Sequence, residues 1–222
     1  MFNVSISKLL LDRNNKMALG TIFCDVVNTN FNESLWKEIE SVSNNIRDKY
    51  ILETIKDNIQ IDATRKMYLA CGKKPGRYRP SAEALMRRIV KGDKLYQINT
   101  LVDLINLLSI KTGYSIGGFD ADNIIGSNII AGIGEENEHY EGIGRGEINI
   151  YKMPVIRDEK GAIGTPTSDE VRTALSLKTK KIFININGYT GKDDLVPAID
   201  IAVELLNKYA NANNIKTNIV LT

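Results

Sequence analysis

Histidine and cysteine are scarce in this chain of 222 residues. The sequence contains one histidine and two cysteines, Cys24 and Cys71, which lie far apart and form no C-x-x-C pair. Structural zinc sites need clusters of these residue types, so we expect no metal and no other cofactor. Two isolated cysteines without a disulfide framework are also typical of a reducing compartment.

Long apolar segments and a strong net charge are also missing. No run approaches the roughly 18 apolar residues of a membrane span, and the N-terminus lacks the charged-then-apolar order of a signal peptide. The formal net charge is only +2, so any attraction to nucleic acid must come from a local cluster of basic residues. These absences predict a soluble, cytoplasmic protein with neither a membrane nor DNA as partner, and they leave its oligomeric state open.

Common nucleotide-binding and hydrolase motifs are absent as well. There is no G-x-x-x-x-G-K-[ST] segment, and the G-x-G-x-G of residues 142–146 leads into a β-like run, whereas a dinucleotide-binding loop leads into a helix. The single histidine, His139, lies in the polar segment GEENEHYEG, where we expect it to be exposed. The sequence therefore disfavours a P-loop, a Rossmann fold and a Ser-His-Asp triad.

The hydrophobic pattern predicts an α+β protein, because helices and strands segregate along the chain more than they alternate. After Gly113 the chain turns often: 11 of its 17 glycines lie between residues 113 and 164. With no repeat or linker in view, we expect one domain over residues 1–222. The expected helices are 33–51 with Asn32 as cap, 59–71, 82–90 with Ser81 as cap, 99–112, and one capped by Asp193 or Asp194. The expected strands are 17–27, 127–133, 146–151, 153–158, 181–187 and 215–222.

Polar residues form a stripe of their own on the helix expected at 99–112. Asn99, Asp103 and Asn106 fall at offsets 0, 4 and 7, beside an apolar face. A solvated face is the common explanation of such a stripe. Asn and Asp are poor helix formers that often fix backbone turns or ligands, so a functional stripe is the alternative.

Basic residues cluster in residues 72–94. Tyr78 lies among them and can stack on a base or sugar. We expect this block to bind RNA, the alternative being a solvated helix whose arginines pair with acidic neighbours. The basic residues are Lys73, Lys74, Arg77, Arg79, Arg87, Arg88, Lys91 and Lys94, against Glu83 and Asp93.

Small hydroxyl residues surround a carboxylate in the segment TPTSD. Thr165, Thr167, Ser168 and Asp169 can hold a small polar ligand or a water, or they can form the N-terminus of a helix. Glu147, in GRGEINI, either faces a pocket or pairs with Arg145.

The combination of INTLVDLINL, FDADNI, GRGEINI and TPTSD resembles the B-three/B-four editing domain of the phenylalanyl-tRNA synthetase β subunit and its free-standing relatives. The resemblance is strongest over residues 77–187, with 1–72 and 193–222 as the extra N-terminal and C-terminal elements. It implies a three-layer α+β fold with a glycine-rich β core and flanking helices. It also implies tRNA binding and hydrolysis of the ester that joins a wrong amino acid to tRNA.

Carried over by position, the resemblance places two pocket glycines at Gly161 and Gly164. Gly117 stands where the synthetase has a histidine, Gly118 replaces an alanine, and Asn185 replaces a glutamate that reads the tyrosine hydroxyl. We expect these losses to enlarge the pocket and reduce its charge, and so to change its substrate. The expected pocket residues are Asn106, Gly117, Gly118, Asp120, Glu147, Gly161, Gly164, Thr165, Thr167, Ser168, Asp169 and Asn185.

The resemblance thus predicts an aminoacyl-tRNA deacylase that acts in trans. Two alternatives remain open. One is an RNA-binding accessory protein without catalysis, and the other is a small-molecule or amino-acid-binding protein that reuses the pocket.

Overall fold

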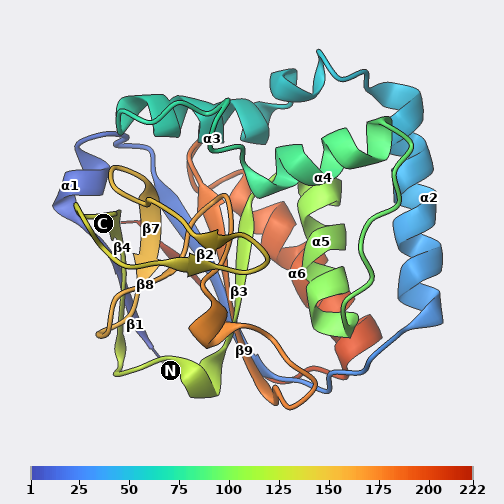
Figure 1. Cartoon of the computed structure of the whole chain (residues 1–222). Helices are drawn as coiled ribbons and strands as arrows, with labels where there is room; N and C mark the ends of the chain where they lie inside the picture. Colours follow the sequence, from blue (N-terminus) through green and yellow to red (C-terminus); the bar gives the residue numbers. More distant parts are fainter. Residues whose placement is uncertain (1, 222) are drawn as a thin grey trace.

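A four-stranded antiparallel sheet forms the middle layer of the computed structural model, which describes residues 2–221 (Figure 1). The two long strands β2 and β9 pair without a break from Ala18 opposite Gly188 to Asp25 opposite Lys181. Their alternation of β-branched and aromatic residues suits a sheet covered on both faces. The strand order is β10 (Asn213–Val220), β2 (Ala18–Asp25), β9 (Lys181–Gly188) and β3 (Ile116–Asp120).

Helices cover one face of this sheet (Figure 1). Ile22 and Ile184 of the sheet share a buried cluster with Leu35, Leu104 and Ala202 of the helices. Burial of this helical stripe is the main force that fixes the layer. Within residues 2–221, no helix combines the length and apolarity needed to cross a membrane. The helices of this layer are α2 (Glu33–Lys49), α4 (Ser81–Val90), α5 (Thr100–Thr112) and α6 (Leu195–Ala210).

A second sheet covers the other face. Its Ile129 and Ile163 pack with Leu19, Phe119 and Phe183 of the middle sheet in a separate buried cluster. Helices, middle sheet and second sheet make three layers, so the predicted α+β arrangement is confirmed. The second sheet has the order β1 (Asn3–Ile6), β4 (Asn128–Ile133), β7 (Pro154–Arg157) and β8 (Ala162–Gly164). The remaining elements are α1 (Lys8–Leu11), α3 (Ile59–Ala70), the hairpin β5 (Glu141–Gly142) and β6 (Gly146–Glu147), and short 3₁₀ turns at Ile55–Asp57, Ala121–Asn123 and Val171–Thr173.

Of the N-cap residues predicted for three helices, only one forms the expected side-chain hydrogen bond. Asn32 caps α2 as expected, by accepting from the N–H of Leu35. Ser81 is the first residue of α4 and not its cap, because Pro80 holds that position and contributes no side-chain bond. Asp194 precedes α6 without a capping hydrogen bond. The strand expected at 146–151 is only two residues long.

Asn99 and Asp103, two of the three residues in the predicted polar stripe, are buried and form structural hydrogen bonds. The explanation of this stripe as a solvated helix face is therefore wrong for these two residues. The Asn99 side chain caps α5 by accepting from the N–H of Val102 at 3.1 Å. Asp103 accepts from the N–H of Ile98 at 3.0 Å and from the Trp36 indole at 2.8 Å. Burial raises the pKa of Asp103, and these two bonds oppose the rise. Both residues therefore fix the segment that leads into α5.

Glu38 on α2 ties three helices together and should make the fold sensitive to acid. Its carboxylate accepts from Lys111 of α5 at 2.7 Å and from Lys208 of α6 at 2.8 Å. Burial opposes ionisation, but these bonds and one from Tyr209 outweigh it and lower the pKa of Glu38 to about 2. A lowered folded-state pKa adds stability that is present above the ordinary pKa and is lost as pH falls toward 2.

When the pH is lowered from 5 to 2.5, the free energy of unfolding should fall in both proteins. We expect the fall to be smaller in Glu38→Gln than in the wild type, by about 1–2 kcal/mol. Urea unfolding at the two pH values measures the difference. Parallel stability curves for the two proteins would contradict the assignment.

Candidate functional site

A cavity of about 240 Å³ lies between α4, α5, the edge strand β3 and the loop 165–175. Its walls are largely apolar, and its polar groups come from Asn106 and Ser109 of α5 and from the TPTSD loop. We call it the α4–α5 cavity. Five of the predicted pocket residues meet there: Asn106, Gly118, Thr165, Ser168 and Asp169. Sequence reasoning missed its apolar walls: Leu85, Ile98, Val102, Ile105, Ile116, Ile143, Ala174 and Leu175.

Among the described residues 2–221, Asp169 is the one acidic residue that lines this cavity. Its Oδ2 accepts from the backbone N–H of Gly118 at 3.1 Å, and no basic side chain within residues 2–221 forms an ion pair with it. Burial raises the pKa of Asp169 to about 7, against the lowering effect of the Gly118 bond. A carboxyl group that titrates near neutral pH can accept or donate a proton under ordinary conditions.

The TPTSD loop is held rigidly by its own hydrogen bonds. The Thr165 hydroxyl accepts from the N–H groups of Thr167 and Ser168, both at 3.1 Å. The Ser168 carbonyl accepts from the Tyr140 hydroxyl at 2.6 Å and from the Thr165 hydroxyl at 3.0 Å. No helix begins here, so the alternative reading of this segment as a helix N-terminus is wrong. The loop instead presents Asp169 to the cavity in a fixed orientation.

The paired glycines of β3 are required by close packing. A Cβ atom on Gly117 would overlap Oδ1 of Asn185 and the ring of Phe119, and one on Gly118 would overlap Ile105 of α5. Gly164 approaches the same Phe119 ring from the second sheet. Gly118 therefore allows β3 to lie close to α5, and Gly164 allows β8 to lie close to the Phe119 ring of β3.

The expected enlargement of the pocket at Gly117 and Asn185 is wrong. Asn185 is 2% exposed and its Nδ2 donates to Oδ1 of Asn187 at 3.1 Å, while its own Oδ1 has no partner. The void beside it measures only about 10 Å³, and only Thr165 and Asp169 line both this void and the α4–α5 cavity. The amide of Asn185 and the Phe119 ring fill the space that a side chain at position 117 would take.

Four other predicted pocket residues lie outside the cavity. Asp120 accepts from the Thr179 hydroxyl at 2.7 Å and from the N–H of Asp122 at 3.1 Å, so it fixes the end of β3. Thr167 is buried and bonds to the Tyr68 hydroxyl at 2.7 Å. Glu147 is exposed on β6 and makes no ion pair with Arg145, and Gly161 lies in the turn before β8.

The model of the B3/4 domain matches this sequence over residues 63–211. The chain belongs to the B3/4 domain family. The resemblance carried by INTLVDLINL, FDADNI and GRGEINI is therefore confirmed, and the match extends beyond the region from which it was inferred. Among curated proteins, none matches this chain.

The fold of this B3/4 domain is similar to the crystal structure of an N-terminal fragment of the phenylalanyl-tRNA synthetase β-subunit from Pyrococcus horikoshii. The TM-score is 0.50 and the sequence identity 16%, so the likeness concerns the fold. The similarity covers 96% of this chain and 50% of that fragment. The chain thus spans about half the length of the fragment that it matches.

The basic segment of the B3/4 domain divides into paired and unpaired cations. Arg79 and Arg87 lie 3.5 and 4.0 Å from the carboxylate of Glu83, which also binds Arg65 of α3 at 2.9 Å. Arg79 and Arg87 therefore pair with an acidic neighbour, as the alternative to RNA binding supposed, and the Arg65–Glu83 pair joins α3 to α4. Within residues 2–221, the rest of the block has no acidic partner: Lys73, Lys74, Arg77, Arg88, Lys91 and Lys94.

Positive charge is crowded around Tyr78. Lys73 Nζ lies 4.4 Å and the Arg77 guanidinium 5.6 Å from the centre of its ring. Partial burial lowers the pKa of Lys73, and the nearby cations Arg77 and Lys152 lower it further. Like charges held together in this way repel one another, so an anion such as phosphate would relieve the repulsion.

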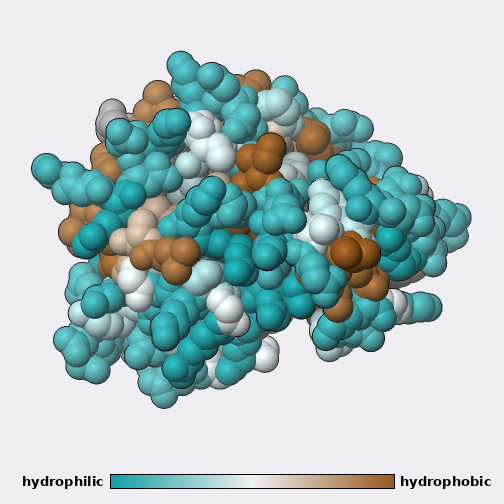
Figure 2. Space-filling view, turned by 90° about the horizontal axis from the view of Figure 1, so that it is seen from above, coloured by the Kyte–Doolittle hydropathy of each residue, from teal (hydrophilic) through white to brown (hydrophobic). Residues whose placement is uncertain are grey.

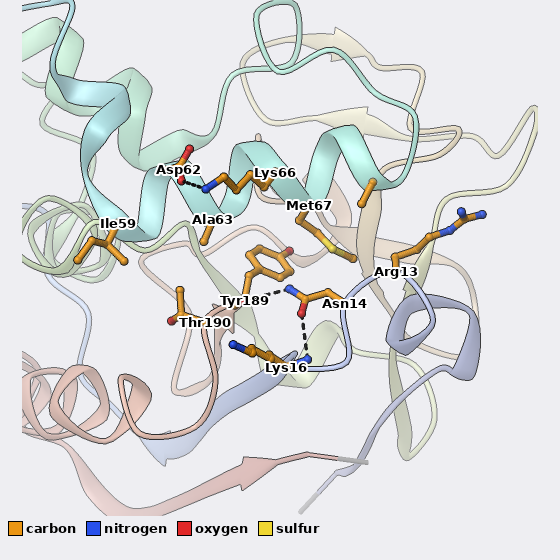
Figure 3. Close-up of a pocket in the computed structure, with 11 residues that line it drawn as sticks. Arg13, Asn14, Lys16, Ile59, Asp62, Ala63, Lys66, Met67, Tyr189 and Thr190 are labelled. Atoms are coloured by element: carbon orange, nitrogen blue, oxygen red, sulfur yellow. Dashed lines mark hydrogen bonds and ion pairs between the residues drawn. The ribbon is translucent and has the colours of Figure 1, made fainter.

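Two further features of the B3/4 domain offer less for chemistry. A depression of about 460 Å³ lies beside α3. In it Lys66 pairs with Asp62, and Asn14 bonds to the Tyr189 carbonyl and the Lys16 N–H (Figure 3). Burial raises the pKa of Cys24 to about 12 and that of Cys71 to about 11, so neither thiol is a nucleophile near neutral pH.

The packing at β3 predicts the effect of a single methyl group. Gly117→Ala should destabilise the B3/4 domain by about 1–3 kcal/mol, because the new Cβ displaces Asn185 or Phe119, both buried. Gly76→Ala is the matched control, since nothing lies within 4 Å of its added Cβ. Urea unfolding of both variants measures the difference. An unchanged Gly117→Ala protein would mean that a side chain is tolerated at position 117.

Proposed function

We propose that this B3/4 domain binds the aminoacyl end of a tRNA and hydrolyses the ester between the amino acid and the terminal ribose. The observation that carries the proposal is Asp169, an acidic side chain without a cation partner, held by a rigid loop at an otherwise largely apolar cavity. The similarity in fold to a phenylalanyl-tRNA synthetase fragment supports a tRNA substrate, and so does the unpaired part of the basic segment.

In the proposed reaction, Asp169 acts as the general base. Its carboxylate takes a proton from a water molecule while the water oxygen attacks the ester carbonyl. The bond from the carbonyl carbon to the ribose oxygen then breaks, and the ribose oxygen receives the proton from Asp169. The products are the free amino acid and tRNA, so the carboxylate is regenerated. A base with a pKa near the working pH is the most effective for such transfers.

The walls of the cavity bear on which amino acid is accepted. Leu85, Val102 and Ile105 favour an uncharged side chain, since burial of an unpaired charge beside them is costly. Asn106 and Ser109 can hydrogen bond to a polar group on that side chain. The substrate class that fits is an apolar or weakly polar amino acid.

The RNA would lie along the basic segment that follows α3. Figure 2 looks onto the face that carries α3 and α4, and this face is mainly hydrophilic with separate hydrophobic spots. Lys74, Arg77 and Lys91 are exposed and lack acidic partners within residues 2–221. Such a surface suits phosphate groups, whose binding weakens as salt concentration rises.

A deacylation screen tests the proposal. Purified protein is mixed with tRNAs that carry correct and incorrect amino acids, and loss of each ester is followed over time. We expect enzyme-dependent loss from one mischarged species, reduced by Ser168→Ala and Thr165→Val. If every ester decays at its background rate while tRNA still binds, the protein is a non-catalytic RNA-binding protein. If tRNA does not bind and Arg77→Glu changes nothing, the pocket serves a small molecule.

A further inference from the structure

We propose that Arg88 and Tyr96 form a stacking platform at the rim of the α4–α5 cavity that binds the terminal base of the aminoacylated tRNA. This proposal rests on the proposed function for its ligand. It adds a nucleobase site to the amino-acid site, so that the bound unit is the 3′-terminal aminoacyl nucleotide.

The first support is the direction in which α4 leaves the cavity. Ser81 and Leu85 line the cavity, and Arg88 follows Leu85 by three residues, on the same face of the helix. Arg88 is therefore the next side chain along α4 outside the cavity. Its Nε donates to the carbonyl of Lys94 at 2.5 Å, which holds the guanidinium against the segment that connects α4 to α5.

The second support is the alternation of side chains in that connecting segment. Leu95 and Gln97 face a groove beside α2, whereas Ile98 lines the α4–α5 cavity and Tyr96 contacts Arg88. Tyr96 and Ile98 thus both face α4. Tyr96 is two residues from Ile98, a distance of about 7 Å along an extended chain, and it lies farther from the cavity. In an aminoacyl nucleotide, one ribose separates the ester from the base, so the two sites can serve one ligand.

The third support is that Arg88 and Tyr96 contact each other while the Tyr96 ring stays exposed to solvent. The Arg88 guanidinium lies 4.1 Å from the centre of the Tyr96 ring, and Arg88 has no acidic partner within residues 2–221. Tyr96 is nevertheless 67% exposed, which leaves one face of the ring free to stack on a base. The segment is fixed before Tyr96 by the Lys94 carbonyl, which accepts from Arg88. It is fixed after Tyr96 by Gln97, bonded to the Asn30 carbonyl at 2.7 Å, and by the Ile98 N–H, bonded to Asp103. A ring held in place loses little entropy when a base stacks on it.

Binding of bulk deacylated tRNA, before and after removal of its terminal adenosine, tests the platform. The wild type should bind intact tRNA about 5- to 100-fold more tightly than trimmed tRNA, the range expected for stacking of one base. Tyr96→Ala should bind intact tRNA more weakly by a similar factor and no longer distinguish the two. Tyr96→Phe should retain the preference, because the ring stacks without its hydroxyl.

Tyr151→Ala is the matched control, because Tyr151 also lies under a cation, Lys152 at 5.0 Å. Tyr96 lies two residues from Ile98 of the cavity lining, whereas none of residues 148–154 around Tyr151 lines the cavity. Tyr151→Ala should preserve the preference for intact tRNA. The platform is overturned if the wild type binds both tRNAs equally, or if Tyr96→Ala keeps the full preference. A preference for intact tRNA that depends on Tyr96, in a protein that hydrolyses no ester, supports the platform and overturns only the catalytic part of the proposed function.

Discussion

Asp169→Asn should lower the rate of ester hydrolysis by about 100-fold or more, because asparagine cannot take a proton from water. The substitution keeps the size of the side chain and an oxygen that can accept from the Gly118 N–H, so tRNA binding should change little. Single-turnover deacylation of the substrate found in the screen measures the effect. Retention of a wild-type rate would exclude Asp169 as the base.

The pH dependence separates loss of a base from loss of the fold. Since burial raises the pKa of Asp169 to about 7, the wild-type rate should rise with pH up to about that value and then level off, and Asp169→Asn should abolish the rise. A raised folded-state pKa also means that stability falls as pH rises from the ordinary value, 3.8, toward 7. Asp169→Asn lacks this loss, so it should be more stable than the wild type at pH 8, by about 1–3 kcal/mol. An inactive variant that is also unstable at pH 8 would contradict this account.

Glu83→Gln should destabilise the protein by about 1–3 kcal/mol, because it removes the buried carboxylate around which three partly exposed arginine side chains gather. The Glu83 side chain is 4% exposed and lies within 4.0 Å of Arg65, Arg79 and Arg87. These contacts join α3 to α4, and α4 forms one wall of the cavity. Urea unfolding measures the loss of stability.

Glu33→Gln is the control for this effect. Glu33 pairs with Lys37 on the surface, where both side chains are more than 70% exposed, and such pairs contribute roughly 0–1 kcal/mol. If Glu83→Gln costs no more than Glu33→Gln, the arginines around Glu83 do not depend on its charge. They would then be available to RNA, as the sequence first suggested for Arg79 and Arg87.

The fold and a third of the residues that line the cavity were accessible from the sequence. Four apolar residues at helical spacing predicted α2: Leu35, Ile39, Val42 and Ile46. Val42 is partly buried and the other three are buried. The TPTSD segment and Asn106 were selected for their chemistry, and they do meet in the cavity with Gly118. The short strands β1 and β8 were missed, because a three- or four-residue strand has too few alternations to stand out.

What the sequence by itself determined is the family, the layer type and the residue types available for chemistry, since these follow from motifs and periodicity. Only the tertiary structure decided which of those residues share a cavity. Asp120 and Asp169 are both carboxylates in motif segments, yet the first is satisfied by Thr179 and the second faces a largely apolar space. Arg87 and Arg88 are neighbours in sequence, but helical geometry turns one toward Glu83 and the other toward Tyr96. The contacts of Asp120 with Thr179 and of Arg88 with Tyr96 join separate segments, so they depend on packing that no local pattern encodes.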